Sequence, residues 1–122
     1  MADKYLLPPF GPLTMNIPRP SIIYDLISTW SSQPSRAHMG RLCAASIGIC
    51  LQPMGAPRYD TDQARPIAFG GVMVDFLIGR GVSPSKMMEV GLAILSSLAP
   101  TLLQEEALKK KSPTTEPPQA GV

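Results

Sequence analysis

The residue types that most often carry chemistry are few in this chain, and their spacing does not favour a reaction centre. His38 is the sole histidine, and Cys43 and Cys50 are the sole cysteines. On a helix with about 100° per residue, His38 lies about 140° from Cys43, so the two side chains are poorly placed to form a nucleophile and its base. A metal ion needs three or four clustered ligands, which these residues do not supply. The sequence therefore predicts no catalytic residues, no metal site and no cofactor.

The two cysteines also do not form a disulfide. They are seven residues apart, which on one helix separates them by about 10 Å along the axis. A disulfide requires Cα atoms within about 7 Å of each other. We expect both cysteines to be reduced, buried and to act as small apolar side chains.

Two further patterns resemble ligand sites and fail on their spacing. Asp60 and Asp62 alternate as in a calcium loop, but no glycine, third oxygen ligand or closing glutamate follows at the required positions. Gly70 and Gly71 are not followed by the lysine or the further glycines of a phosphate-binding loop. Neither pattern indicates a small-molecule substrate.

Charge and hydropathy favour a protein partner over nucleic acid. The 11 Lys and Arg residues are scattered apart from the Lys109–Lys111 triplet, and the net charge is +2. The continuous basic surface that nucleic acid needs is therefore not expected. An apolar fraction of 44% with only 16% charged residues indicates a rather apolar surface, which favours association with another protein or with a second copy.

The chain is expected to stay in the cytoplasm. Its first residues do not combine a basic region with a long apolar run, so they do not resemble a secretion signal. The longest uncharged stretches are shorter than the ~20 residues that a membrane-spanning helix needs, and they contain proline. No transmembrane segment is predicted.

The elements that must position any site are organised around a helix over 35–51. Its apolar residues cover most of its circumference and leave a narrow strip of small side chains, which is typical of a helix in the middle of a bundle. Gly40, Ala44 and Gly48 recur at four-residue spacing and predict close approach of another helix. The helix should end near Gln52, because Pro53 cannot continue it.

Three more helices are predicted, over 21–30, 66–80 and 84–99, and together the four predict an all-α fold, a small orthogonal or up-down bundle. Pro100 should kink or restart the last helix, which then continues as a helical extension to about 111. The segment 66–80 has an apolar face at helical spacing: Phe69, Val72, Met73, Phe76 and Leu77. Gly81 should end this helix in the left-handed conformation, and Ser83 with Pro84 should begin the next one.

The flanking segments divide the chain into an extended Pro-rich arm over 1–20, the helical domain over 21–111 and a disordered tail over 112–122. The arm is too rich in proline for a helix and too apolar for a free tail. Two alternatives remain open for it: it packs on its own domain, or it packs on a partner. The segment 52–66 is predicted to be a long loop, and such loops are often functional.

The arm and this loop hold the residues that the sequence predicts to bind a protein partner. Apolar side chains of the arm and polar or aromatic side chains of the loop are types suited to interface anchors. They are Leu6, Leu7, Phe10, Leu13, Arg58, Tyr59 and Arg65. A helical DNA-binding protein that reaches phosphates with Arg36 and Arg41 is the alternative from another functional class.

The order of elements also resembles a known family. A short helix ends at Trp30, an alanine- and glycine-rich helix covers 34–50, and a Pro-rich loop leads to a helix that ends at 79–82. Over residues 20–99 this order is similar to small tail-assembly accessory proteins of bacteriophages. The resemblance implies a non-enzymatic assembly factor or chaperone made in the host cytoplasm, and it leaves a structural virion component open. No functional residue carries over from it.

Overall fold

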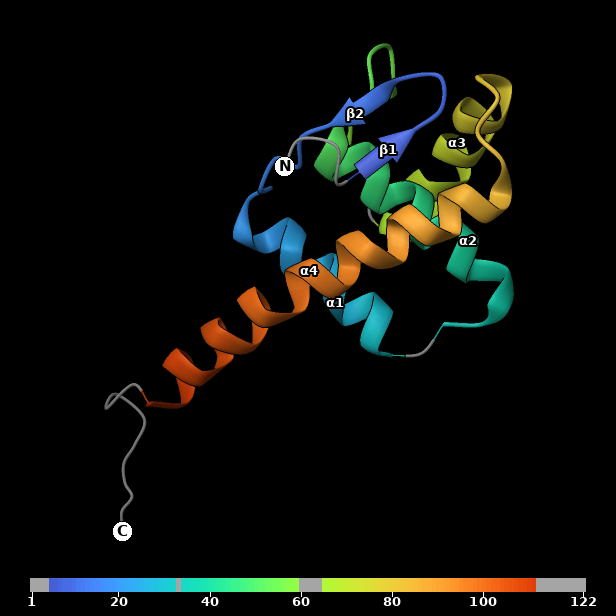
Figure 1. Ribbon diagram of the computed structural model, residues 1–122. Helices are drawn as coiled ribbons and strands as arrows, with labels where there is room; N and C mark the ends of the chain where they lie inside the picture. Colours follow the sequence, from blue (N-terminus) through green and yellow to red (C-terminus); the bar gives the residue numbers. More distant parts are fainter. Residues whose placement is uncertain (1–4, 33, 60–64, 112–122) are drawn as a thin grey trace, which may run out of the picture.

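The computed structural model describes residues 5–32, 34–59 and 65–111, with side-chain environments up to residue 100. In the described residues a short hairpin is followed by four α-helices, and Figure 1 shows their arrangement. The elements are β1 (Tyr5–Leu7), β2 (Gly11–Leu13), α1 (Pro20–Ser31), α2 (Arg36–Ser46), the π-helix η2 (Ile47–Leu51), α3 (Pro66–Gly79) and α4 (Pro84–Lys111). The prediction of a mostly helical chain with four helices is confirmed, and the small sheet is an addition to it.

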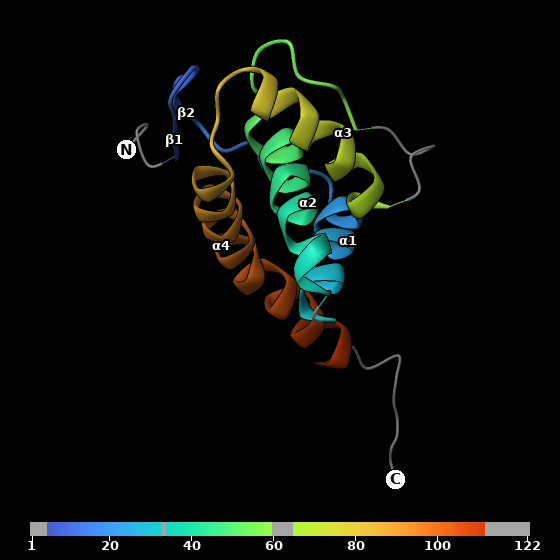
Figure 2. The ribbon, with the colours of Figure 1, turned by 90° about the vertical axis from the view of Figure 1, so that its right-hand side faces the viewer.

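The core is built around α2 and η2. Every residue from 42 to 51 is buried, and Figure 2 shows α2 lying between α3 and α4. Ser46 has the one buried polar side chain among the described residues. Its hydroxyl donates a hydrogen bond to the Leu42 carbonyl oxygen at 3.0 Å. This bond satisfies a group that would otherwise be costly to bury.

Glycines on α3 and α4 allow both helices to touch the α2 backbone. A Cβ atom at Gly70 of α3 would overlap the carbonyl group of Arg41, and a Cβ atom at Gly91 of α4 would overlap Cys43. On α2 and η2 themselves, the expected close approach occurs at Gly48, where a Cβ atom would lie 2.7 Å from Met73 Sδ. At Gly70 and Gly91 glycine is therefore required by packing against backbone rather than by backbone conformation, whereas the neighbour of Gly48 is a flexible methionine side chain.

The last five residues of the predicted helix 35–51 form a π-helix instead of an α-helix. The Gln52 N–H group donates to the Ile47 carbonyl oxygen at 3.3 Å, five residues back. Gln52 has a φ of 49°, in the left-handed region, and Pro53 follows. The predicted end of the helix is confirmed, and the final turn is wider than an α-helical one.

The C-terminus of α3 has the predicted glycine end. Gly81 has a φ of 92°, and its N–H group donates to Ile78 O while the N–H group of Val82 donates to Leu77 O, each at 3.0 Å. These two bonds form a Schellman motif. Val82 and Leu77 are both buried, so the turn also contributes to the core.

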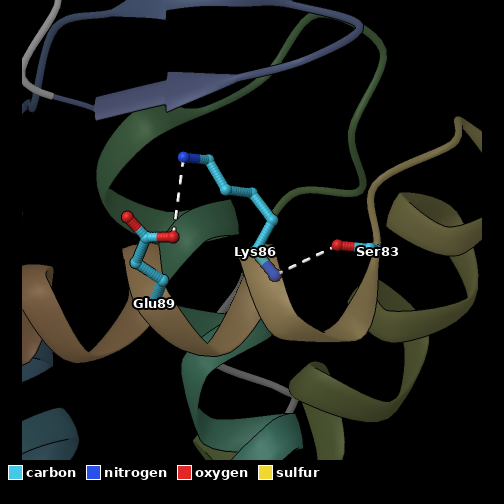
Figure 3. Close-up of polar contacts among 3 residues, drawn as sticks. All are labelled: Ser83, Lys86 and Glu89. Atoms are coloured by element: carbon cyan, nitrogen blue, oxygen red, sulfur yellow. Dashed lines mark hydrogen bonds and ion pairs between the residues drawn. The ribbon is translucent and has the colours of Figure 1, made fainter.

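The start of α4 confirms the predicted cap. The Lys86 N–H group donates to Ser83 Oγ at 3.2 Å, and Lys86 Nζ lies 3.6 Å from Glu89 Oε1 (Figure 3). At Pro100 the predicted restart does not occur, since α4 continues through it to Lys111 as one helix. A proline removes only one N–H donor from the helix. The residues that follow are rich in Leu, Glu, Ala and Lys, which have high helix propensity and favour continuation of the helix.

The predicted apolar face of α3 is corrected at one position. Phe69, Met73 and Leu77 point into the core, four residues apart, whereas Val72 is 51% exposed. Because α3 is apolar on all sides apart from Asp75, periodicity alone could not select the buried face.

The arm packs on its own domain. Its strands pair antiparallel, with Tyr5 opposite Leu13. Leu7 is fully buried, and the Tyr5 hydroxyl lies 2.9 Å from Ser97 Oγ of α4. The ring of Phe10 stacks on that of Phe76 with centroids 6.1 Å apart. Of the two alternatives for the arm, the structure shows the first.

Within the described part of the chain, no helix combines the length and the hydropathy needed to cross a membrane. The predicted tail over 112–122 lies outside the described residues.

Candidate functional site

The chemistry-bearing residues lie apart in the structure. His38 is exposed near the start of α2, whereas Cys43 and Cys50 are buried and free. Burial raises the pKa of the Cys43 thiol to about 11 and that of the Cys50 thiol to about 12, because desolvation disfavours the thiolate. Among the described residues, no three His, Cys, Asp or Glu side chains are grouped so that they could hold a metal ion.

A cleft opens in the described surface beside the loop that follows η2. Its volume is about 680 Å³, and it lies between residues 16–19 with Ile22 of α1 on one side and residues 48–49 and 52–59 on the other. We call it the loop cleft. Its size is that of a binding site for a small ligand or for a few residues of a peptide.

Backbone interactions hold the two walls of the loop cleft in place. The Asn16 N–H group donates to the Cys50 carbonyl oxygen at 2.7 Å, which ties the segment after β2 to the end of η2. The loop itself turns where the Ala56 N–H group donates to Pro53 O at 3.0 Å. Gly55 has a φ of 81° within this turn. One wall is therefore held by a long-range backbone hydrogen bond, and the other is shaped by local turn chemistry after the buried helix.

Two large apolar side chains of the loop cleft are unusually exposed. Ile17 is 65% exposed and Met54 is 86% exposed, one on each wall. Apolar side chains that flank one hollow form a surface that gains free energy when it is covered. A methionine adapts its shape to different apolar groups more easily than a branched side chain does.

The loop cleft is also basic. Arg19 and Arg58 line it, both are exposed, and neither forms an ion pair with another described residue. Among the described residues that line it, none is Asp or Glu. Arg80 lies close by: its guanidinium packs over the Phe76 ring, 5.0 Å from the centroid, and reaches within 3.4 Å of where Gly55 would carry a Cβ atom. A carboxylate in the cleft would meet unpaired guanidinium groups.

No family model, curated protein or solved structure matches this chain. The function of the loop cleft is therefore argued from its own residues.

Of the residues predicted to bind a partner, two line the loop cleft and the other five do not. Arg58 and Tyr59 line the loop cleft, and the Tyr59 ring packs edge-on against Phe69 with centroids 5.2 Å apart. Arg65 is exposed next to α3 but does not line the cleft. Asp60 lies outside the described residues, as does Asp62.

The four predicted residues of the arm have different environments on the hairpin. Leu6 is exposed, Phe10 and Leu13 are partly buried against the core, and Leu7 is fully buried. The Leu7 side chain is therefore inaccessible to a partner in this fold, and its prediction as a binding residue is wrong. None of these four residues lines the loop cleft, although residues 16–19 of the same arm do.

Sequence reasoning missed the cleft residues Ile17, Arg19 and Met54. The sequence did contain a signal for the exposure of Ile17 and Arg19, because prolines alternate with them at positions 18 and 20. Such a segment is extended and cannot bury its side chains in a helix or a central strand. For Met54, the only signal in the sequence was its position after Pro53 in the predicted loop.

Proposed function

We propose that this chain is a non-enzymatic protein-binding factor that holds an extended segment of its partner in the loop cleft. The observation that carries this proposal is the pairing of exposed Ile17 and Met54 with the unpaired Arg19 and Arg58 around one hollow. The partner segment carries an apolar side chain with Asp or Glu next to it. The apolar group covers the two exposed side chains, and the carboxylate binds the guanidinium groups.

The resemblance to phage tail-assembly accessory proteins makes an assembly role one specific form of this proposal. A chaperone of that kind must cover an apolar segment of another protein before assembly. The loop cleft is suited to such a task because it combines adaptable apolar contact with charge selection.

The test measures binding of fluorescent ten-residue peptides in which Asp or Glu flanks a single Leu, Ile or Phe. Matched peptides carry Asn or Gln in place of the acid. We expect the acidic set to bind and the amide set to bind at least about tenfold more weakly. Binding should also weaken as salt is raised from about 0.1 M to about 1 M, because the charges are exposed and are screened.

The protein variant for this test is Arg19→Ala combined with Arg58→Ala, which should weaken acidic-peptide binding at least about tenfold with little change in melting temperature. The control is Arg36→Ala, which removes an exposed arginine that does not line the loop cleft. Equal binding by the double variant and the control would reject the proposed site. Tight, salt-sensitive binding of duplex DNA without acidic-peptide binding would support the DNA-binding alternative instead.

A further inference from the structure

A second groove lies away from the loop cleft, where the first turns of α2 meet α3 and the start of α4. Its volume is about 370 Å³. Small residues of α2 and α3 line it together with Ile78, which is 50% exposed, and with Met88 of α4. We call it the α3–α4 groove. Apolar side chains predominate in its lining, so covering it removes apolar surface from water.

Two glycines of this groove are not required by the packing of the chain on itself. A Cβ atom at Gly40 in α2 would meet nothing within 4 Å, and one at Gly71 in α3 would meet only Arg41 Nε, at 3.9 Å. Glycine inside a helix lowers stability relative to alanine. Unlike Gly70 and Gly91, these two glycines gain no close helix contact in return within the described chain.

The groove also contains one charge of each sign. Arg41 and Asp75 both line it, and neither forms an ion pair with another described residue. In a two-fold symmetric interface the same patch meets itself, so that residue i of one copy contacts residue j of the other, and j contacts i. If such a patch carries one unpaired acid and one unpaired base, the acid of each copy meets the base of the other.

A protruding apolar surface adjoins the groove on the same helix. Val72 and Ile78 of α3 are each about half exposed, although α3 as a whole is apolar apart from Asp75. Helices that are apolar on all sides are normally covered on all sides. Ile78 is exposed and apolar, and the space above Gly40 is open, so the side chain of one copy is of a type that fills the groove of another.

We propose that the α3–α4 groove is the interface of a homodimer, with Ile78 of each copy seated over Gly40 of the other and with Arg41 facing Asp75 across the two-fold axis. The second copy is favoured over an unrelated partner because this patch carries both the groove and the side chain that fills it, and both members of the charge pair.

The first test fills the groove from inside with Gly40→Leu. The space above Gly40 is open, so the variant should fold and melt at or above the wild-type temperature. Sedimentation equilibrium from about 1 µM to about 1 mM should show a dimer for the wild type and a dissociation constant at least about tenfold higher for the variant. The control Ala93→Leu adds the same bulk at an exposed position of α4 outside the groove and should dimerise normally.

The second test separates contacts between copies from contacts within one copy. Arg41→Asp and Asp75→Arg each place like charges opposite each other in a homodimer, so each variant alone should be monomeric. When the two variants are mixed, both pairs become complementary and a heterodimer should form. A wild-type chain that is monomeric at the highest concentration, a Gly40→Leu variant that dimerises as tightly as wild type, or a mixture that stays monomeric would each overturn the proposal.

Discussion

Cys43 and Cys50 place two titratable groups in the interior of the molecule, because the segment from 42 to 51 is buried on all sides. Their folded-state pKa values are raised to about 11 and about 12, from 9.0 in the unfolded chain. The unfolded state therefore releases these protons at a lower pH than the folded state. The resulting stability is fully present below pH 9 and is lost as the pH rises toward 11–12.

We predict that the free energy of unfolding falls above pH 9 by up to about 1.4 kcal/mol per pH unit for each thiol. Urea titrations at a series of pH values measure this slope. Lysines and tyrosines titrate in the same range, so the matched variant is Cys43→Ala with Cys50→Ala. The variant should lose less stability over that range, and parallel curves for the two proteins would contradict the burial of the thiols.

Single residues also show where sequence reasoning succeeds. The role of Gly81 was predictable because the left-handed turn at a helix end is a local property of the chain, which glycine favours strongly. Gly70 and Gly91 could not be assigned in the same way. Their need for glycine arises from contact with the α2 backbone at Arg41 and Cys43, and that contact depends on how three separate helices pack.

At the scale of elements, the hairpin is the part of the fold that the sequence did not reveal. Its strands are three residues long, and Pro8, Pro9 and Pro12 obscure any alternation of apolar and polar residues. Its order comes instead from contact with α3 and α4, through the Phe10–Phe76 stack and the Tyr5–Ser97 contact. An element this short is stable only when it is docked.

We predict that substitutions of the two neighbouring leucines of β1 have effects of very different size on stability. Leu7→Ala removes a fully buried side chain and should cost about 2–5 kcal/mol of unfolding free energy. Leu6→Ala alters an exposed side chain and should change it by less than about 0.5 kcal/mol. Chemical denaturation measures both values. Equal, small effects would indicate that the hairpin does not pack on the core.

The helices were easier to predict than their exposed faces. Capping residues and prolines fixed the start of α4 and the end of η2 close to their observed positions. The exposure of Val72 was not predictable, since α3 offers apolar residues in every direction. Such a helix fits equally well in several rotations until its neighbours are known.

At the scale of the whole molecule, two surfaces have separate proposed roles. We propose that the loop cleft receives a segment of a partner and that the α3–α4 groove joins two copies of the chain. Arg58 and Tyr59 were predicted to bind a partner because they lie in a long polar loop, whereas the cleft that they line was not predicted. Ile17 was not predicted either, because its nearness to the loop depends on the bond between Asn16 and Cys50.

The most direct test of the central claim is amide chemical-shift mapping of the isotope-labelled full chain during titration with the tightest-binding acidic peptide. The protein concentration is held constant so that any dimerisation contributes equally at every point. We predict that the largest shifts occur at residues 16–22 and 48–59, and that the Arg19→Ala, Arg58→Ala variant loses them. No shifts up to about 1 mM peptide, or the largest shifts at the N-terminal half of α2, would contradict the account.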